Sequence, residues 1–250
     1  MCGLPILYSV IVGLVSGALL ASTGTIGPFL IPALLFIGFP SSLARGTCLM
    51  SELLMTLISV ILHERGRNLD RRVILAYLPG LITVALGAIW STNFPESLMK
   101  LAIGVFQIII GFTLIVTTLK RFDKQDSKTV FDKNAMFRLV IVALFAGFYK
   151  GFFGAGWGPI GIGLFVLLGI DPRIAVGSSL IVRLLLDCVG GFTYVGMNLV
   201  DYDTVIYLTA SGSFAAYIAY KLTKGTSSRT LEIYLGLIIM ILGALVIAGQ

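Results

Sequence analysis

The sequence predicts an all-α membrane protein made of two inverted-topology repeats, each with a glycine-rich, broken re-entrant hairpin followed by three transmembrane helices. Three observations support this fold class. The 250-residue chain is 57% hydrophobic and only 12% charged, its two halves repeat the same glycine positions, and Lys and Arg gather in different loops of the two halves.

Composition places the chain in a lipid bilayer. Its mean hydropathy is +1.00, and a soluble domain of this length cannot bury that much apolar surface. The formal net charge of +6 comes mostly from Lys and Arg beside apolar runs, a pattern of membrane topology rather than of nucleic-acid binding. The three cysteines are widely spaced and have no His partner, which argues against a disulfide framework or a zinc site. We expect a small-molecule substrate, no cofactor and no metal.

The apolar runs follow the same order in both halves. In the first half they are 5–21, a short run at 28–38, and full spans at 41–62, 73–91 and 97–119. In the second half they are 138–153, a short run at 159–169, and full spans at 174–195, 204–220 and 230–248. The full spans are close to the roughly 20 residues that a bilayer requires. No strand-type alternation persists, which excludes a β-barrel.

The repeated glycines indicate a duplicated chain. The corresponding pairs are Gly17/Gly147, Gly24/Gly154, Gly27/Gly158, Pro28/Pro159, Gly46/Gly177, Gly80/Gly212, Gly104/Gly236 and Gly111/Gly243. So many glycines in register are the signature of an internal repeat. We therefore divide the chain into a first transmembrane repeat at 5–119, a cytoplasmic linker at 120–137 and a second, inverted repeat at 138–249.

Loop charges predict that the two repeats are inverted. Loop 63–72 carries four arginines, whereas its counterpart at 196–203 carries no Lys or Arg. Loop 92–97 carries none, whereas its counterpart at 221–229 carries three. Because cytoplasmic loops hold the excess of Lys and Arg, corresponding loops face opposite sides. We expect a multi-pass protein of the cell membrane with a cytoplasmic central loop and an external C-terminus.

The short runs predict two hairpins whose turns lie inside the bilayer. Run 159–169 would extend only about 16 Å as a helix, too short to cross the membrane. The turns are therefore expected at 24–27 and 154–158. Irregular backbone at that depth is tolerated only where protein or a water-filled cavity surrounds it.

The two turns are candidate anion sites. Pro28 and Pro159 stand where a helix would begin, so each short arm directs free N–H groups and a partial positive charge at its turn. Glycine lets a ligand approach such N–H groups closely. The alternative is that these glycines only let helices pack tightly. The predicted substrate-binding residues are Gly24, Thr25, Gly27, Pro28, Lys150, Gly154, Gly156, Trp157, Gly158 and Arg183.

Four ionisable residues lie well inside the predicted spans, where each is a functional candidate by default: Glu52, Lys150, Arg183 and Asp187. Lys150 either supplies an unpaired positive charge to an anion or snorkels to the membrane surface. Arg183 and Asp187, four residues apart, can also form a local structural pair. Glu52 aligns with Arg183 between the halves and is expected to meet it. Burial disfavours a charged carboxyl, so we predict that Glu52 or Asp187 carries a coupled proton.

The motifs resemble the sulfite exporter TauE/SafE family over almost the whole chain. The glycine-rich hairpins are followed by Ala44-Arg-Gly-Thr47 in the first half and by Ala175-Val-Gly-Ser178 in the second. A family-type loop appears as Arg65-Gly-Arg-Asn-Leu-Asp70. The resemblance implies secondary transport of small sulfur-containing anions such as sulfite, sulfonates or thiosulfate. The chain departs from the family's Gly-x-Gly-Gly-Gly core, and Trp157 can reshape the pocket.

Two other functions remain open at this level. An anion channel would share the hairpins but would not need interior charges of both signs. An intramembrane enzyme would need an activated nucleophile, and no histidine lies inside a span to activate one. The remaining arrangement would be a Ser–Lys dyad with Lys150, and the candidate nucleophiles are Ser16, Ser22, Ser51 and Ser178.

Overall fold

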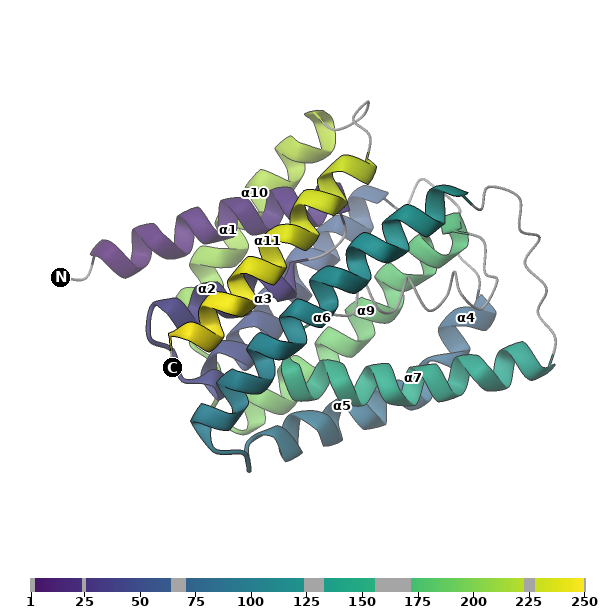
Figure 1. The fold of residues 1–250 in the computed structure, drawn as a ribbon, viewed down its shortest axis with the longest axis horizontal. Coiled ribbons are helices and arrows are strands. Elements are labelled where there is room, and N and C mark those ends of the chain that lie inside the picture. The colour runs from purple at the N-terminus through teal and green to yellow at the C-terminus, as the bar shows by residue number, and fades with distance from the viewer. Residues whose placement is uncertain are drawn as a thin grey trace.

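The computed structural model describes residues 3–23, 26–63, 71–123, 133–155, 172–222 and 228–249. All the regular secondary structure in these ranges is helical (Figure 1). Gly24, Thr25, the turn residues 156–158 and the short arm predicted at 159–169 lie outside the described residues.

The described helices follow the predicted apolar runs. In the first half they are α1 (Gly3–Thr23), α2 (Gly27–Phe36), α3 (Ser41–His63), α4 (Arg71–Ala76), α5 (Leu78–Ser91) and α6 (Glu96–Asp123). In the second half they are α7 (Lys133–Phe153), α9 (Pro172–Gly196), α10 (Tyr202–Leu222) and α11 (Ser228–Ala248).

The predicted span at 73–91 is divided at Tyr77 into α4 and α5. Pro79 explains the break, because proline has no N–H and its ring clashes with the carbonyl four residues earlier. Hydrogen bonds to the residue three positions earlier replace the α-helical pattern here: Tyr77 N–H donates to Ile74 O at 3.1 Å, and Gly80 N–H donates to Tyr77 O at 2.9 Å. The chain continues as a helix because proline is well tolerated in the first turn of α5.

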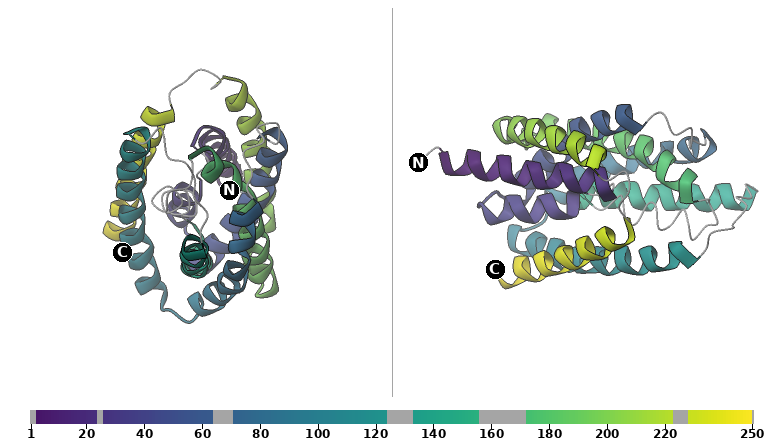
Figure 2. Two further views of the ribbon diagram at one scale, coloured as in Figure 1. Left: turned by 90° about the vertical axis from the view of Figure 1, so that its right-hand side faces the viewer. Right: turned by 90° about the horizontal axis from the view of Figure 1, so that it is seen from above.

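Helices from different halves pack in pairs. α1 packs on α10, α5 on α7, α6 on α11 and α3 on α9. α6 and α11 run side by side along one wall of the molecule (Figure 2). Glycines make the close approach possible, since a Cβ on Gly17 would overlap the Gly212 carbonyl and one on Gly147 would overlap the Gly80 carbonyl. These are small-residue contacts of the kind that hold membrane helices together.

The outer surface is apolar. Ile82, Phe112, Phe145, Ile206 and Phe214 are each 61–68% exposed. Four stretches among the described residues are long and apolar enough to cross a bilayer: Ile74–Ser91, Glu96–Leu119, Met136–Phe153 and Ser178–Gly196. Large exposed apolar side chains on several helices are unfavourable in water and fit lipid instead. The fold is that of an all-helical membrane protein.

Candidate functional site

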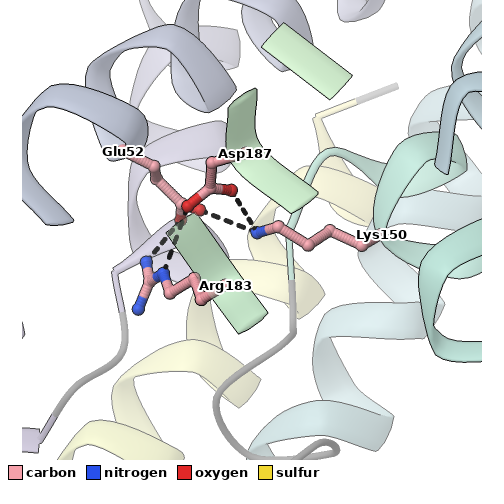
Figure 3. A network of polar contacts seen from close by, with 4 residues as sticks. All are labelled: Glu52, Lys150, Arg183 and Asp187. Atoms are coloured by element: carbon pink, nitrogen blue, oxygen red, sulfur yellow. Dashed lines mark hydrogen bonds and ion pairs between the residues drawn. The ribbon is translucent and has the colours of Figure 1, made fainter. Parts of the chain in front are cut away.

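Four buried charged side chains meet between α3, α7 and α9 (Figure 3). Glu52 comes from α3, Lys150 from α7, and Arg183 and Asp187 both come from α9. None is more than 3% exposed. We call these four residues the charge network.

The charge network is a closed ring of ion pairs. Lys150 Nζ lies 2.9 Å from Glu52 Oε2 and 2.7 Å from Asp187 Oδ1. Arg183 Nη2 lies 3.1 Å from Glu52 Oε1, and its Nε lies 3.5 Å from Asp187 Oδ2. Each cation thus contacts both carboxylates, and the ring has a formal charge of zero.

Local structure explains how the ring is assembled. Arg183 and Asp187 are one helical turn apart, so both point from the same face of α9. Glu52 reaches them because α3 packs on α9. Lys150 stands one turn before Gly154, where α7 ends with φ +74° and the Gly154 N–H donates to Lys150 O at 2.8 Å. That left-handed conformation suits glycine and fixes where the chain turns.

The ring explains how four charges are tolerated in an apolar interior. A lone ionised side chain at membrane depth costs about 3 kcal/mol or more. Mutual pairing offsets this cost only while every member is present. Removing one member of such a buried pair leaves an uncompensated charge, at a cost of about 3–5 kcal/mol.

The described parts of both hairpins meet at the charge network. α2 begins at Gly27, with Pro28 in its first turn, and both residues are buried. A Cβ on Gly27 would overlap Glu52 Oε1 and would lie 2.8 Å from the Cβ of Ala155, just past the end of α7. The N-terminus of α2, which carries a partial positive charge, is therefore directly beside the Glu52 carboxylate.

The structure corrects the environment expected for Lys150, whereas its role in anion binding stays a prediction. Lys150 is 0% exposed, so it does not snorkel, and two carboxylates pair with it, so it is not an unpaired cation. Glu52 and Arg183 do meet, as the alignment of the halves predicts. The expected local pair of Arg183 with Asp187 is present, but as one side of the larger ring.

Gly24, Thr25, Gly156, Trp157 and Gly158 lie outside the described residues. Of the four candidate serines, Ser16, Ser51 and Ser178 are buried, and the side chain of Ser22 is outside the described part. Within the described residues, both ion-pair partners of Lys150 are carboxylates, and no Ser–Lys dyad is formed.

A second buried polar group adjoins the tip of the second hairpin. Arg45 on α3 is 1% exposed; its Nε donates to Ser41 O at 3.0 Å and its Nη1 donates to Phe152 O at 2.8 Å. Nη1 also lies 3.2 Å from Met99 Sδ. The side chain of Arg45 packs against Gly154, where an added Cβ would lie 2.8 Å from the Arg45 Cβ. Arg45 thereby binds a C-terminal carbonyl of α7.

Tyr194 supports the same end of α7. Its hydroxyl is fully buried, donates to Gly151 O at 3.1 Å and lies 3.0 Å from Ser91 Oγ. The sequence interpretation did not select Tyr194 or Arg45 as site residues. One signal was present: Arg45 occupies a position of the repeated Ala-x-Gly motif where the second half has Val176.

The chain matches the sequence model of the sulfite exporter TauE/SafE family over residues 9–246. It is 26% identical over 217 residues to the probable membrane transporter protein YdhB of Bacillus subtilis (strain 168), covering 83% of this chain and 86% of that protein. The probable membrane transporter protein YjnA of the same organism is 25% identical, covering 94% of this chain and 96% of the relative.

An archaeal relative is similar over nearly its whole length. The probable membrane transporter protein MJ0441 of Methanocaldococcus jannaschii is 24% identical, with 96% of this chain and 94% of the relative covered. The family match spans nearly all of the described helices and includes every member of the charge network. This chain therefore belongs to the sulfite exporter TauE/SafE family of membrane transporters.

Proposed function

We propose that the chain is a secondary transporter that moves a small anionic sulfur compound across the cytoplasmic membrane by alternating access, coupled to protons. Sulfite, thiosulfate and organosulfonates form the proposed substrate class. The observation that carries the proposal is the buried charge network at the point where both hairpins meet, in a chain of this family.

Helix contacts support a twofold relation between the halves, and many transporters with such repeats work by alternating access. Exchanging the halves converts the α1–α10 pair into the α7–α5 pair, and it leaves the α3–α9 and α6–α11 pairs unchanged. The glycines obey the same exchange. A Cβ on Gly104 would lie 2.8 Å from Gly243 O, and a Cβ on Gly236 would lie 2.8 Å from Gly111 O. We propose that the halves are related by a twofold axis in the membrane plane.

The mechanism follows from competition for the two cations. In the empty ring, Glu52 and Asp187 already neutralise Lys150 and Arg183, so an added anion has no free partner there. Protonating one carboxylate removes one negative charge and makes a cation available. One proton is thus taken up with the anion, and both leave when the repeats rock to the opposite side.

The hairpin turns are the proposed binding surface. The N-terminus of α2 lies against Glu52, so an anion that displaces this carboxylate would gain the same N–H dipoles. Lys150 and Arg183 would add full charges in a low-dielectric site, where they attract an anion more strongly than in water. We assign Gly24, Thr25, Gly156, Trp157 and Gly158 to the same surface by their positions in the sequence.

We infer that the chain is not an enzyme. The relatives are named as transporters, and Lys150 is engaged by carboxylates rather than held beside a serine. We further propose the cell membrane as its location, with the central loop in the cytoplasm and the C-terminus outside.

The test is transport in proteoliposomes. Purified protein is reconstituted, a pH gradient is imposed, and uptake of labelled sulfite, thiosulfate and methanesulfonate is measured. We expect gradient-driven uptake of at least one anion in the wild type, and loss of the pH dependence in Glu52→Gln or Asp187→Asn. If both variants keep pH-driven transport, proton coupling through the charge network is refuted. An anion flux that does not saturate with anion concentration and does not depend on the pH gradient would favour an anion channel.

A further inference from the structure

The hydroxyl of Thr56 on α3 is buried and makes no hydrogen bond within the described part of the chain; the residue is 0% exposed. A threonine inside a helix commonly donates to a carbonyl three or four residues earlier in its own helix. Thr83, Thr117 and Thr193 all do so. Thr56 makes no such bond to the described backbone, so its hydroxyl is available to a group outside its own helix.

Thr56 stands one helical turn after Glu52, so the two residues share one face of α3. Ser51, the residue before Glu52, is also 0% exposed, and its hydroxyl likewise has no partner among the described residues. Buried polar groups of this kind bind ordered water, which needs two to four polar partners. One helical turn of α3 offers two such hydroxyls and a carboxylate, so we expect water beside Glu52.

The Glu52 carboxylate can accept a hydrogen bond from that water while it remains in the charge network. Lys150 and Arg183 each contact one of its oxygens, at 2.9 and 3.1 Å. A carboxylate oxygen accepts more than one hydrogen bond. The other groups around it among the described residues are the Asp187 carboxylate, the thiol of Cys48 one turn earlier on α3, and the N-terminus of α2. None of these prevents water from approaching from the Thr56 side.

The opposite direction from the charge network is packed by apolar side chains. One turn beyond Asp187, a Cβ on Gly190 would lie 3.2 Å from Val84 Cγ2 and 3.3 Å from Leu49 Cδ1, and both of these side chains are 0% exposed. The next hydroxyl on α9 belongs to Tyr194 and is already bonded to Gly151 O. Apolar contacts do not carry protons, so this side separates Asp187 from water.

The face of α3 beyond Thr56 continues with residues that exchange protons. Ser59 and His63 follow three and seven residues after Thr56 in the sequence of α3, which are the next positions of the same helical stripe. Histidine serves as a proton shuttle near neutral pH. We assign both residues to this stripe by sequence position alone. The stripe runs from the charge network to the end of α3 that the proposed topology places in the cytoplasm.

We propose that Glu52 is the carboxylate that binds the coupled proton, and that the Thr56 hydroxyl relays this proton to it through water. This inference rests on the proposed function and selects between its two carboxylates. A hydronium ion on the Thr56 side gives up a proton, which passes along the water and the hydroxyl to a Glu52 oxygen. Each carrier gains one O–H bond and loses one, so only Glu52 changes charge. The ion pairs of Glu52 then weaken, and a cation becomes available to the anion.

The experiment measures anion-driven proton entry into proteoliposomes with a trapped pH-sensitive dye. The proteins are the wild type, Thr56→Val, Thr56→Ser and Glu52→Gln. Thr117→Val is the matched control, because the Thr117 hydroxyl is bonded within its own helix, α6. Sulfite, thiosulfate and methanesulfonate are each added outside. The affinity of each variant for the same anions is measured in detergent from thermal stabilisation, which rises with ligand concentration relative to the dissociation constant.

We expect proton entry in Thr56→Val to be at least about tenfold slower than in the wild type, because a positioned proton-transfer group is lost. Thr56→Ser, which keeps the hydroxyl, and Thr117→Val should remain close to the wild-type rate, and Glu52→Gln should show no anion-driven proton entry. Anion affinity of Thr56→Val should be unchanged, since a relay changes the rate of protonation and not its equilibrium.

Three results would overturn the inference while leaving the proposed transport in place. They are a wild-type rate of proton entry in Thr56→Val, equal slowing in Thr56→Ser or in Thr117→Val, and proton entry that Asp187→Asn abolishes but Glu52→Gln retains. If Thr56→Val does not fold, Thr56→Ala removes the hydroxyl without adding an apolar group and takes its place in the comparison. Absence of proton entry with all three anions in the wild type would instead overturn the proposed proton coupling, and this inference with it.

Discussion

Replacing Lys150 by methionine tests the energetic importance of the charge network. The amine lies 2.9 Å from one carboxylate and 2.7 Å from another, and all the groups are buried. Without it, Glu52 and Asp187 share Arg183, and the ring carries a net negative charge. Breaking a buried pair in this way costs about 3–5 kcal/mol. At about 2–4 °C per kcal/mol for a chain of this size, the unfolding temperature should fall by about 6–20 °C.

A compensating variant separates charge from packing. Lys150→Met combined with Asp187→Asn restores neutrality, because Glu52 and Arg183 then pair alone. We expect the double variant to recover at least half of the loss, as measured by thermal unfolding in detergent under ligand-free conditions. Lys100→Met, which removes an exposed pair, should stay within about 0.5 kcal/mol of the wild type. If the stability losses of Lys150→Met and Asp187→Asn add up in the double variant, or if Lys150→Met alone is as stable as the wild type, the ring does not stabilise the fold.

Three further predictions concern the backbone and the topology. Gly17→Ala should lower the free energy of unfolding by about 1–3 kcal/mol, because its Cβ would overlap a carbonyl of α10. Gly196→Ala is the control, since a Cβ there would enter open space and should not change stability. Equal thermal unfolding effects of the two variants would contradict this prediction. Gly154→Ala should lower the free energy of unfolding by about 1–2 kcal/mol or more, because φ is +74° and the new methyl group would crowd Arg45. An unchanged unfolding temperature would show that the turn relaxes to accept the methyl group. A C-terminal tag should be labelled from outside intact cells and a tag in loop 63–72 only after permeabilisation; labelling of both from one side would refute the topology.

Most helices could be predicted from the sequence because bilayer spans need long apolar runs, and this chain interrupts them with polar loops. The break at Tyr77 was missed because hydropathy does not change there; it depends on the missing N–H of Pro79, a local backbone effect. The start of α2 at Gly27 and Pro28 was predictable for the same kind of local reason, since proline fits the first helical turn.

The site was predictable only in part because its members are far apart in the chain. The alignment of the halves places Glu52 opposite Arg183, and the two form an ion pair. The partners of Lys150 come from α3 and α9, and no local spacing relates them to α7. Arg45 was overlooked because it stands near the start of a helix, where a cation usually contacts solvent or lipid headgroups. Its burial depends on the end of α7, where Gly154 packs against its side chain.

The zero formal charge of the ring has an electrical consequence. A single elementary charge that crosses the full membrane field gains or loses about 2.3 kcal/mol for every 100 mV. A ring with two positive and two negative members does no such work when it moves as a unit. In the proposed alternating-access cycle, the membrane voltage therefore exerts no net force on this ring as a unit, and voltage steps applied without substrate should evoke no displacement current from it.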